Sequence, residues 1–315
     1  MGTTINLATG PGIPLETSRI FTPLGIRFWD LTQNLPVSDG LQVNLRLMNS
    51  QAPPLYAVTT SSGVYAFFGL PGLRAAEYRD GSGQLGSPPR TFSYVVTVQD
   101  NLGRYLPQVL IYTLDQSGAV LVNGVPDTTR GARLAYLFSA PGRPAPPGVA
   151  AVRAWLVEQK PDGTTAPAAW AVMRVQVTGQ AEIWPGIADD SGRVLVLVPY
   201  PLLDRLKLGS PPGSGQGNIS GESWPVTVTV QYSPAAFSFP LANVQGLSWP
   251  FTLTPNLKNI LEDQKAATIW ADPATPVTKF SASLNLGREL VLRSAALSPP
   301  ALVPSLNISQ GTSPP

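Results

Sequence analysis

Proline and glycine recur along the whole chain and restrict its fold more than any other feature. Together, 34 Pro and 29 Gly make up one-fifth of the 315 residues. Proline lacks the backbone donor that helices and central strands need, and glycine weakens helix interiors. The hydrophobic fraction is nevertheless 43%, which is enough apolar surface to bury a core. This combination predicts an all-β protein with many turns.

Strand-like alternation of apolar and polar residues supports this prediction. It covers residues 41–47, 92–98, 151–157, 172–177, 226–230 and 280–286, and such alternation is typical of half-buried strands. Helical patterns are scarce. The sequence predicts one helix at 255–267, with Thr254 as its cap and Pro255 at its first position. A short helical turn is expected at 201–206.

Two sequence patterns of the first half recur in the second half. Residues 59–71 and 188–199 both run from a polar approach through a Ser-Gly turn and a strand to a closing proline. The sequence Asn-Leu-Gly-Arg occurs at 101–104 and again at 285–288. Two patterns in the same order predict two related modules. Their unequal spacing predicts a long insertion in the second module, supplied by residues 209–221 and 255–267.

These patterns predict four parts of the chain. They are an extended N-terminal arm at 1–18, a β-sandwich module at 19–114, an elaborated β-sandwich module at 130–293 and a proline-rich C-terminal arm at 294–315. The arms hold aliphatic residues between prolines, and proline blocks strand pairing. We therefore expect at least one arm to order on a neighbouring subunit. Frayed ends are the alternative.

One segment of the first module follows a known pattern. Its matching residues are Leu35-Pro-Val-Ser-Asp-Gly40, Leu41-Gln-Val43, Thr59, Gly63, Tyr65, Phe67, Leu70, Pro71 and Gly72. The segment resembles the carboxypeptidase-regulatory-like or prealbumin-like β-sandwich family over about residues 24–73, and the second module shares only the part from Ser-Gly to Pro. The resemblance implies non-catalytic spacer, adaptor or adhesive modules. The overall make-up also resembles accessory proteins of phage-tail-like contractile injection particles.

The absence of cysteine and histidine excludes whole classes of chemistry. Zinc fingers, iron–sulfur clusters, disulfides and triads that use either residue are impossible. The formal net charge of +2 gives little support to nucleic-acid binding. The N-terminal sequence has no signal-peptide pattern, and no apolar run is long enough to span a bilayer. We expect a protein that is made in the cytoplasm, does not insert into a membrane and is at most carried out within a released or cell-associated particle.

Acidic residues are the remaining candidates for chemistry. Asp189 and Asp190 could form a carboxylate pair or half of a calcium loop, but the spacing of a calcium loop is missing. A turn in which the Asp side chain binds the backbone is the favoured interpretation. Asp30, Asp39 and Asp100 adjoin strands in the same way.

Other short motifs are weaker. Residues 214–218 are glycine-rich but lack the Lys-Ser/Thr of a phosphate loop, so a surface loop is favoured. Asn218 and Asn307 begin glycosylation sequons, which we attribute to chance in the absence of a signal peptide.

Tryptophan is the last candidate for a binding function. The seven are Trp29, Trp155, Trp170, Trp184, Trp224, Trp249 and Trp270. They could form an aromatic platform for sugars or serve as core and interface anchors, and the second interpretation is favoured.

The sequence therefore assigns no catalytic, cofactor-binding or metal-binding residue, and it predicts a protein that is not an enzyme. The main prediction is a structural or adaptor subunit of a large assembly, with a contractile injection particle as the favoured assembly and other protein subunits as partners. One alternative is a carbohydrate-binding or adhesive β-sandwich protein with a glycan contact. A second alternative is a carboxylate-dependent, glycosidase-type enzyme.

Overall fold

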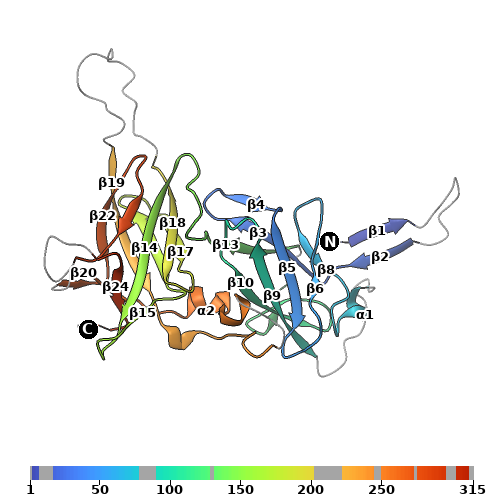
Figure 1. Cartoon of the computed structure of the whole chain (residues 1–315). Helices are drawn as coiled ribbons and strands as arrows, with labels where there is room; N and C mark the ends of the chain where they lie inside the picture. The colour runs from blue at the N-terminus through green and yellow to red at the C-terminus, as the bar shows by residue number, and fades with distance from the viewer. Residues whose placement is uncertain are drawn as a thin grey trace, which may run out of the picture. The chain divides into compact units, whose positions relative to one another are not determined.

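The computed structural model describes residues 2–6, 17–77, 90–127, 131–201, 222–244, 250–272, 275–295 and 303–311. β-Strands are the main regular structure of these residues, with two short α-helices among them (Figure 1). The predicted all-β class, with tandem antiparallel sandwiches, is confirmed. In the described part of the chain, no helix has the length and apolar character needed to cross a bilayer.

Unit 1 comprises Met1–Leu102, Pro107–Leu137 and Phe239–Leu257. Its strands are β1 (Gly2–Asn6), β2 (Thr17–Phe21), β3 (Leu24–Asp30), β4 (Leu35–Val37), β5 (Leu41–Leu47), β6 (Leu55–Tyr56), β7 (Val58–Thr59), β8 (Tyr65–Phe67), β9 (Thr91–Asp100), β10 (Gln108–Asp115), β11 (Leu121–Val122), β12 (Val125–Pro126) and β13 (Arg133–Leu137), and its helix is α1 (Arg74–Glu77). One sheet has the order β10-β9-β5-β6. The other has the order β13-β3-β8-β7, with β4 also paired to β3. Two hairpins, β1-β2 and β11-β12, stand apart from these sheets.

Strand β3 shows how the sequence builds the first sandwich. Its residues Leu24, Ile26 and Phe28 are buried, whereas the alternate positions point to the outer face. The turn before β8 places Tyr65 against Phe28, with ring centroids 5.3 Å apart. Gly63 has a φ of 72° in that turn, a left-handed conformation that glycine adopts readily. The alternating pattern therefore does create a two-sheet core.

Unit 2 comprises Gly103–Leu106, Phe138–Ser238 and Lys258–Pro315. Its strands are β14 (Val149–Gln159), β15 (Thr165–Pro167), β16 (Val172–Val177), β17 (Ile183–Ile187), β18 (Arg193–Pro199), β19 (Ser223–Gln231), β20 (Thr268–Asp272), β21 (Thr275–Val277), β22 (Phe280–Asn285), β23 (Leu290–Leu292) and β24 (Leu306–Ser309), and α2 spans Leu257–Glu262. One sheet has the order β15-β14-β24-β20-β21, with β18 and β23 also paired to β14. The other has the order β17-β16-β19-β22.

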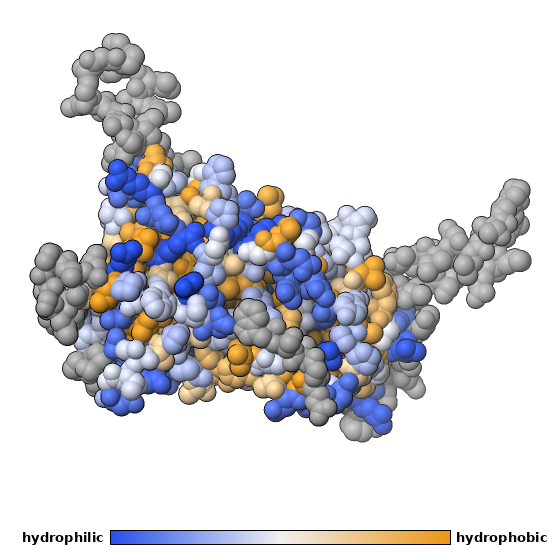
Figure 2. Space-filling view, in the orientation of Figure 1, coloured by the Kyte–Doolittle hydropathy of each residue, from blue (hydrophilic) through white to orange (hydrophobic). Residues whose placement is uncertain are grey.

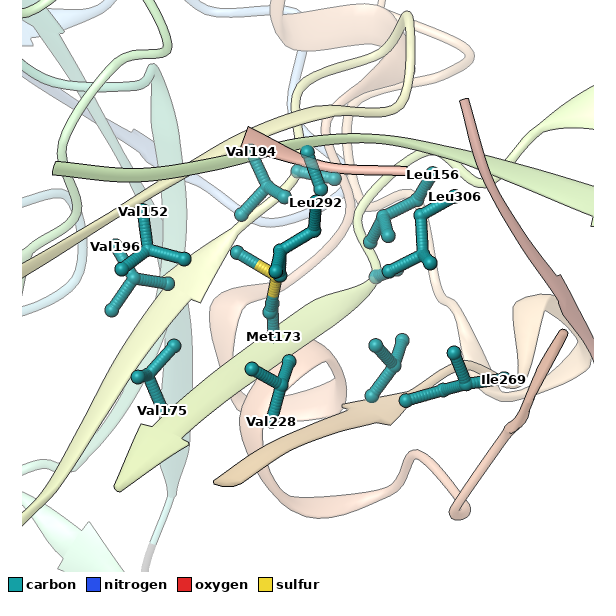
Figure 3. Close-up of a cluster of buried hydrophobic side chains, with 14 of the residues drawn as sticks. Val152, Leu156, Met173, Val175, Val194, Val196, Val228, Ile269, Leu292 and Leu306 are labelled. Carbon is teal, nitrogen blue, oxygen red and sulfur yellow. The ribbon is translucent and has the colours of Figure 1, made fainter. Parts of the chain in front are cut away.

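Valine-rich strands fill the core of unit 2 (Figure 3). Met173 of β16 lies among aliphatic side chains from both sheets, and it is fully buried. Val152 of β14, Val196 of β18 and Val228 of β19 belong to the same cluster. Close packing of such branched side chains between two sheets is the main source of stability for a sandwich.

The two units share one topology. In each, the first strand of the two-sheet sandwich pairs antiparallel with the strand after the Ser-Gly turn and parallel with a strand late in the unit. In unit 1, β3 pairs with β8 and β13 in this way. In unit 2, β14 pairs with β18 and with β23. The opposing sheets, β10-β9-β5-β6 and β22-β19-β16-β17, also run in the same order. The structure thus supports two related modules.

The Ser-Gly pattern is equivalent in the two units, and the second pattern is not. Backbone hydrogen bonds close the turn from Thr60 to Val64 at 2.8 Å and from Asp189 to Arg193 at 2.8 Å. The Asn-Leu-Gly-Arg turn at 101–104 joins β9 to β10, but the one at 285–288 leads from β22 into β23. Only the first pattern therefore reflects a repeated structural element.

The insertion in unit 2 lies between β19 and β22. The connection from Phe67 to Thr91 equals in length the one from Pro199 to Ser223, so residues 209–221 do not lengthen the second module. The structure of those residues, and of the helical turn expected at 201–206, lies outside the described part beyond Pro201.

The predicted helix at 255–267 is shorter than expected. It spans only Leu257–Glu262, and the hydroxyl of Thr254 donates to the Pro250 carbonyl at 2.9 Å instead of capping it. Beyond Glu262, the Gln264 side-chain amide donates to the Ile260 carbonyl at 2.8 Å and the Trp170 carbonyl at 2.9 Å. These side-chain contacts replace further helical turns.

The described terminal residues pair with strands of the same chain, whereas the sequence predicted arms that order on a neighbouring subunit. At the N-terminus, β1 pairs antiparallel with β2 over five residue pairs. At the C-terminus, β24 lies inside a sheet, and Leu306 and Ile308 belong to the core of unit 2. The sheet of unit 2 supplies the pairing that the proline-rich flanks cannot supply locally. The units also differ from the predicted ranges, because unit 1 extends to Leu137 and takes in 239–257.

Candidate ligand-binding face

The acidic candidates bind backbone amides in turns. Asp189 Oδ1 accepts hydrogen bonds from the Ser191 amide at 2.9 Å, the Ser191 hydroxyl at 2.7 Å and the Arg193 amide at 2.9 Å. Asp30 Oδ1 likewise accepts from the amides of Thr32 at 2.8 Å and Gln33 at 3.0 Å. These carboxylates stabilise turns, as the favoured interpretation predicted.

The other acids follow this pattern. Asp100 Oδ1 accepts from the Leu102 amide at 3.3 Å, and Asp39 lies in a bend before β5. Among the described residues, no group of three or more acids is placed to hold a metal ion. The glycine-rich residues 214–218, with Asn218, lie outside the described part. Asn307 lies within β24, between two paired strands.

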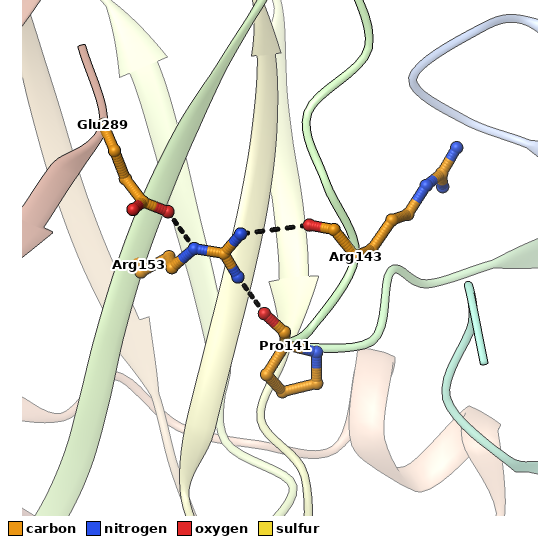
Figure 4. Close-up of polar contacts among 4 residues, drawn as sticks. All are labelled: Pro141, Arg143, Arg153 and Glu289. Atoms are coloured by element: carbon orange, nitrogen blue, oxygen red, sulfur yellow. Dashed lines mark hydrogen bonds and ion pairs between the residues drawn. The ribbon is translucent and has the colours of Figure 1, made fainter.

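Arg153 is the centre of a polar network in unit 2 (Figure 4). Its guanidinium forms an ion pair with Glu289 and donates to the backbone carbonyls of Pro141 and Arg143, the latter at 3.0 Å. The Arg143 guanidinium lies 4.7 Å from the centre of the Tyr105 ring. Carbonyls and one carboxylate satisfy Arg153, so this network fixes chain segments and presents no nucleophile or acid–base pair.

Most described tryptophans are anchored in the core. Trp170 and Trp270 are buried, and Trp184 and Trp224 pack partly against the core of unit 2. Trp249 lies outside the described part. Trp29 and Trp155 differ, because Trp29 is half-buried on an outer sheet face and Trp155 is 40% exposed. The prediction of core anchors therefore holds for four of the tryptophans, and two remain as candidates for binding.

Trp29 belongs to a row of aromatic and apolar side chains across three strands of unit 1. In the strand register, Trp29 of β3 pairs with Tyr136 of β13 on one side and with Pro36 of β4 on the other. Residues paired across strands point to the same face, and here that face is the outer one. Tyr136 is 42% exposed and Leu134, two residues earlier, is 52% exposed. We call Trp29, Pro36, Leu134 and Tyr136, together with Arg27, the aromatic face.

Polar groups fix and border the aromatic face. The indole N–H of Trp29 donates to Asn34 Oδ1 at 3.0 Å, which holds the ring toward the turn between β3 and β4. Asn34 itself has a φ of 52°, a conformation that asparagine tolerates better than most residues. Arg27 pairs in register with Leu134 and donates to the Ser62 carbonyl at 3.4 Å. Its buried Nε has no hydrogen-bond partner among the described residues. The face thus combines fixed ring surface with a guanidinium.

Trp155 has a different environment. Its indole N–H donates to the Ser191 carbonyl at 2.9 Å, and its register partner on β18 is Arg193. No aromatic residue pairs with it in the described sheet. The outer face of unit 1 therefore places two aromatic residues on paired strands, whereas Trp155 has no aromatic register partner. Figure 2 shows apolar residues interspersed with hydrophilic ones on the visible surface.

Sequence reasoning identified Trp29 only as one tryptophan of seven, and it did not identify Tyr136. Trp29 and Tyr136 become register partners because β13 pairs in parallel with β3, although about one hundred residues separate them in the sequence. Alternation in residues 133–137 was the available signal, since Leu134 and Tyr136 share one face of a strand. No residue pattern near 133–137 indicates that β3 is the strand that pairs with β13.

Comparisons with known proteins give distant likenesses only. No family model and no curated protein matches the chain. Among solved structures, a C-terminal fragment of the pilus adhesin SpaC from Lactobacillus rhamnosus GG is similar, with 10% identity and a TM-score of 0.20, over 91% of this chain and 96% of that one. The Bacillus anthracis TIE protein has 9% identity and a TM-score of 0.20 over 86% of this chain. The chain spans 47% of that protein.

A putative adhesin from Bacteroides ovatus has 11% identity and a TM-score of 0.17, over 72% of this chain and 78% of that one. The comparisons give no support to a contractile injection particle. Structural similarity at TM-scores of 0.17 to 0.20 assigns no function to this chain.

Proposed function

We propose that this chain is a non-catalytic, carbohydrate-binding adhesive protein that holds its ligand on the aromatic face of unit 1. The observation that carries the proposal is the row formed by Tyr136, Trp29 and Pro36 on three paired strands. Neighbouring strands lie about 4.8 Å apart, so the row spans about 10 Å. One or two pyranose rings cover such a length.

The chemistry of the row suits a sugar. A pyranose ring carries C–H groups on one face and hydroxyls around its edge, so an aromatic surface bordered by donors matches both parts. Trp29 and Tyr136 offer the ring surface, and Arg27 offers N–H donors to hydroxyls. Because the sheet fixes these groups before the ligand arrives, little conformational entropy is lost on binding.

The acidic residues support a non-catalytic role. A glycosidase-type enzyme needs two carboxyl groups facing each other across a cleft. Asp30, Asp100 and Asp189 instead direct their oxygens to turn amides. We therefore prefer binding without turnover to the glycosidase alternative.

A glycan array tests the proposed function. We expect the intact protein to bind a subset of glycans and Trp29→Ala and Tyr136→Ala to lose at least tenfold in affinity. Trp155→Ala is the matched control, because it removes an exposed tryptophan from a face without an aromatic row. Loss of binding in Trp155→Ala alone would contradict the assignment to the aromatic face, and no binding by the intact protein would contradict the function itself.

A further inference from the structure

The last described strand, β24, has an unusual position for so short a strand. It contains only Leu306–Ser309, yet it lies inside a sheet, between β14 and β20. It pairs in parallel with β14, where Leu306 faces Leu156, and antiparallel with β20, where Ser309 faces Thr268. The space between β14 and β20, which we call the slot, is therefore completed by a short segment that arrives last in the sequence.

The slot matches the side chains of this segment. Leu306 and Ile308 are fully buried and share the core of unit 2 with Leu156 and Ile269. The indole N–H of Trp270 donates to the Ser309 hydroxyl at 2.9 Å. Two apolar positions and one polar contact thus select both the sequence and the register of the strand.

A buried carboxylate completes this recognition. Glu158 of β14 is buried, and the side-chain amide of Gln310, directly after β24, donates to it. The Tyr232 hydroxyl lies 3.5 Å from the same carboxylate. A buried charge is costly when its hydrogen bonds are missing. The slot is therefore incomplete without Gln310, as well as without the two aliphatic side chains.

The connection to β24 has a sequence that favours extension. Backbone hydrogen bonds join Ser294 to Ser305 at 2.9 Å and to Val303 at 3.0 Å. The two ends of the connection to β24 therefore lie next to each other. The residues between include Pro299 and Pro300. Consecutive prolines prefer an extended backbone that rises about 3.1 Å per residue.

We propose that the slot also accepts the Leu306–Gln310 segment of a second copy of this chain, so that copies join by strand exchange. The exchanged strand makes the same contacts as the chain's own strand, so exchange requires no new complementary surface. The length and stiffness of the segment before β24, together with the protein concentration, then decide whether β24 fills the slot of its own chain or the slot of a second copy. This inference is independent of the ligand bound by the aromatic face.

The cysteine-free sequence allows a direct test by disulfide trapping in the full-length protein. Val157 and Asn307 are register partners of β14 and β24, and both are half-buried. Copies with Val157→Cys alone are co-expressed with copies with Asn307→Cys alone and then oxidised. Strand exchange predicts a disulfide-linked dimer of one copy of each kind. The double variant within one chain verifies that the pair can form the bond.

Co-expression of Val291→Cys with Asn307→Cys is the matched control, because Val291 pairs with Arg153 and not with β24. Light scattering of the unmodified protein gives a second readout, in which we expect the fraction of dimers or larger species to rise with concentration. Pro299→Ala combined with Pro300→Ala should lower that fraction severalfold. The proposal is overturned if the mixed copies give no more linked dimer than the control, or if the unmodified protein remains monomeric at all concentrations.

Discussion

Gly192 occupies a turn in which a side chain has no room. Its φ is 80°, and a Cβ there would lie 2.4 Å from the Leu156 carbonyl oxygen. Gly287 has a similar φ of 71°, but a Cβ there would have no atom of the described residues within 4 Å. We expect Gly287→Ala to cost about 1–2 kcal/mol through backbone strain. Gly192→Ala should cost about 1–3 kcal/mol more through the clash. Chemical denaturation measures both, and equal losses would contradict the packing described for this turn.

Two tyrosines of unit 1, the buried Tyr94 and the half-buried Tyr112, make stability depend on alkaline pH. Burial, reinforced by the nearby Glu77 charge, raises the pKa of Tyr94 to about 12. Burial also raises the pKa of Tyr112 to about 12, although Arg133 opposes this shift. Both values exceed the ordinary value of 10.0. The stabilisation from these neutral side chains is therefore complete below about pH 10 and is lost as the pH rises through about 12.

The double variant Tyr94→Phe, Tyr112→Phe tests this pH dependence. We expect its unfolding free energy to fall less steeply between pH 10 and pH 12 than that of the unmodified protein. At neutral pH the variant is less stable, because the Tyr94 hydroxyl donates to the Pro71 carbonyl at 2.6 Å. The test therefore compares how steeply the unfolding free energy of each protein falls with pH, not its value at one pH. Parallel slopes in the two proteins would show that these tyrosines do not cause the alkaline loss.

At the scale of elements, β24 is stabilised by its two neighbouring strands. Leu306→Ala opens a cavity in the core of unit 2 and should cost about 2–5 kcal/mol. Leu102→Ala is a matched control, because Leu102 is 60% exposed and its truncation should cost less than about 0.5 kcal/mol. Thermal or chemical unfolding distinguishes the two variants. If Leu306→Ala unfolds like Leu102→Ala, the strand is not part of the core.

The sequence predicts some elements well because their signal is local. The strand at 41–47 and the strand at 172–177 coincide with β5 and β16, since alternation over six or seven residues records burial on one face. In β24 only Leu306 and Ile308 alternate, and prolines surround them. Its stability comes from β14 and β20, which lie far away in the sequence.

The aromatic face could be predicted only in part for a similar reason. Trp29 is visible in the sequence, but its exposure depends on which strands flank β3. Tyr136 becomes its neighbour through the parallel pairing of β13 with β3, two strands that lie about one hundred residues apart in the sequence. No turn or repeat near residue 136 indicates that partner, so the row becomes visible only in the folded sheet.

At the scale of the whole molecule, the chain returns to unit 1 to complete its packing. Residues 239–257, from the insertion between β19 and β22, belong to unit 1. Leu241 and Phe251 of this segment form a buried cluster with Val95 and Val109 of the sheet. The first 137 residues therefore lack part of their own core.

A fragment of residues 17–137 should show this dependence. We expect it to be less stable than unit 1 in the full chain and to bind a hydrophobic dye, because Val95 and Val109 lose their cover. Full-length Phe251→Ala, which removes one ring and keeps the rest of the segment, should fall between the two. A fragment as stable as the full chain, without dye binding, would show that the segment contributes nothing to the packing of unit 1.

The central claim is that the aromatic face binds carbohydrate, and the indole N–H signals of the tryptophans test it most directly. Trp29→Phe assigns the Trp29 signal in a ¹⁵N-labelled sample, and Trp270, whose N–H is bound to Ser309 in the core, is the internal reference. On titration with a glycan selected on the array, we predict a saturable shift of the Trp29 signal while the Trp270 signal stays in place. A glycan that binds and shifts the Trp155 signal while leaving Trp29 unchanged would contradict the account.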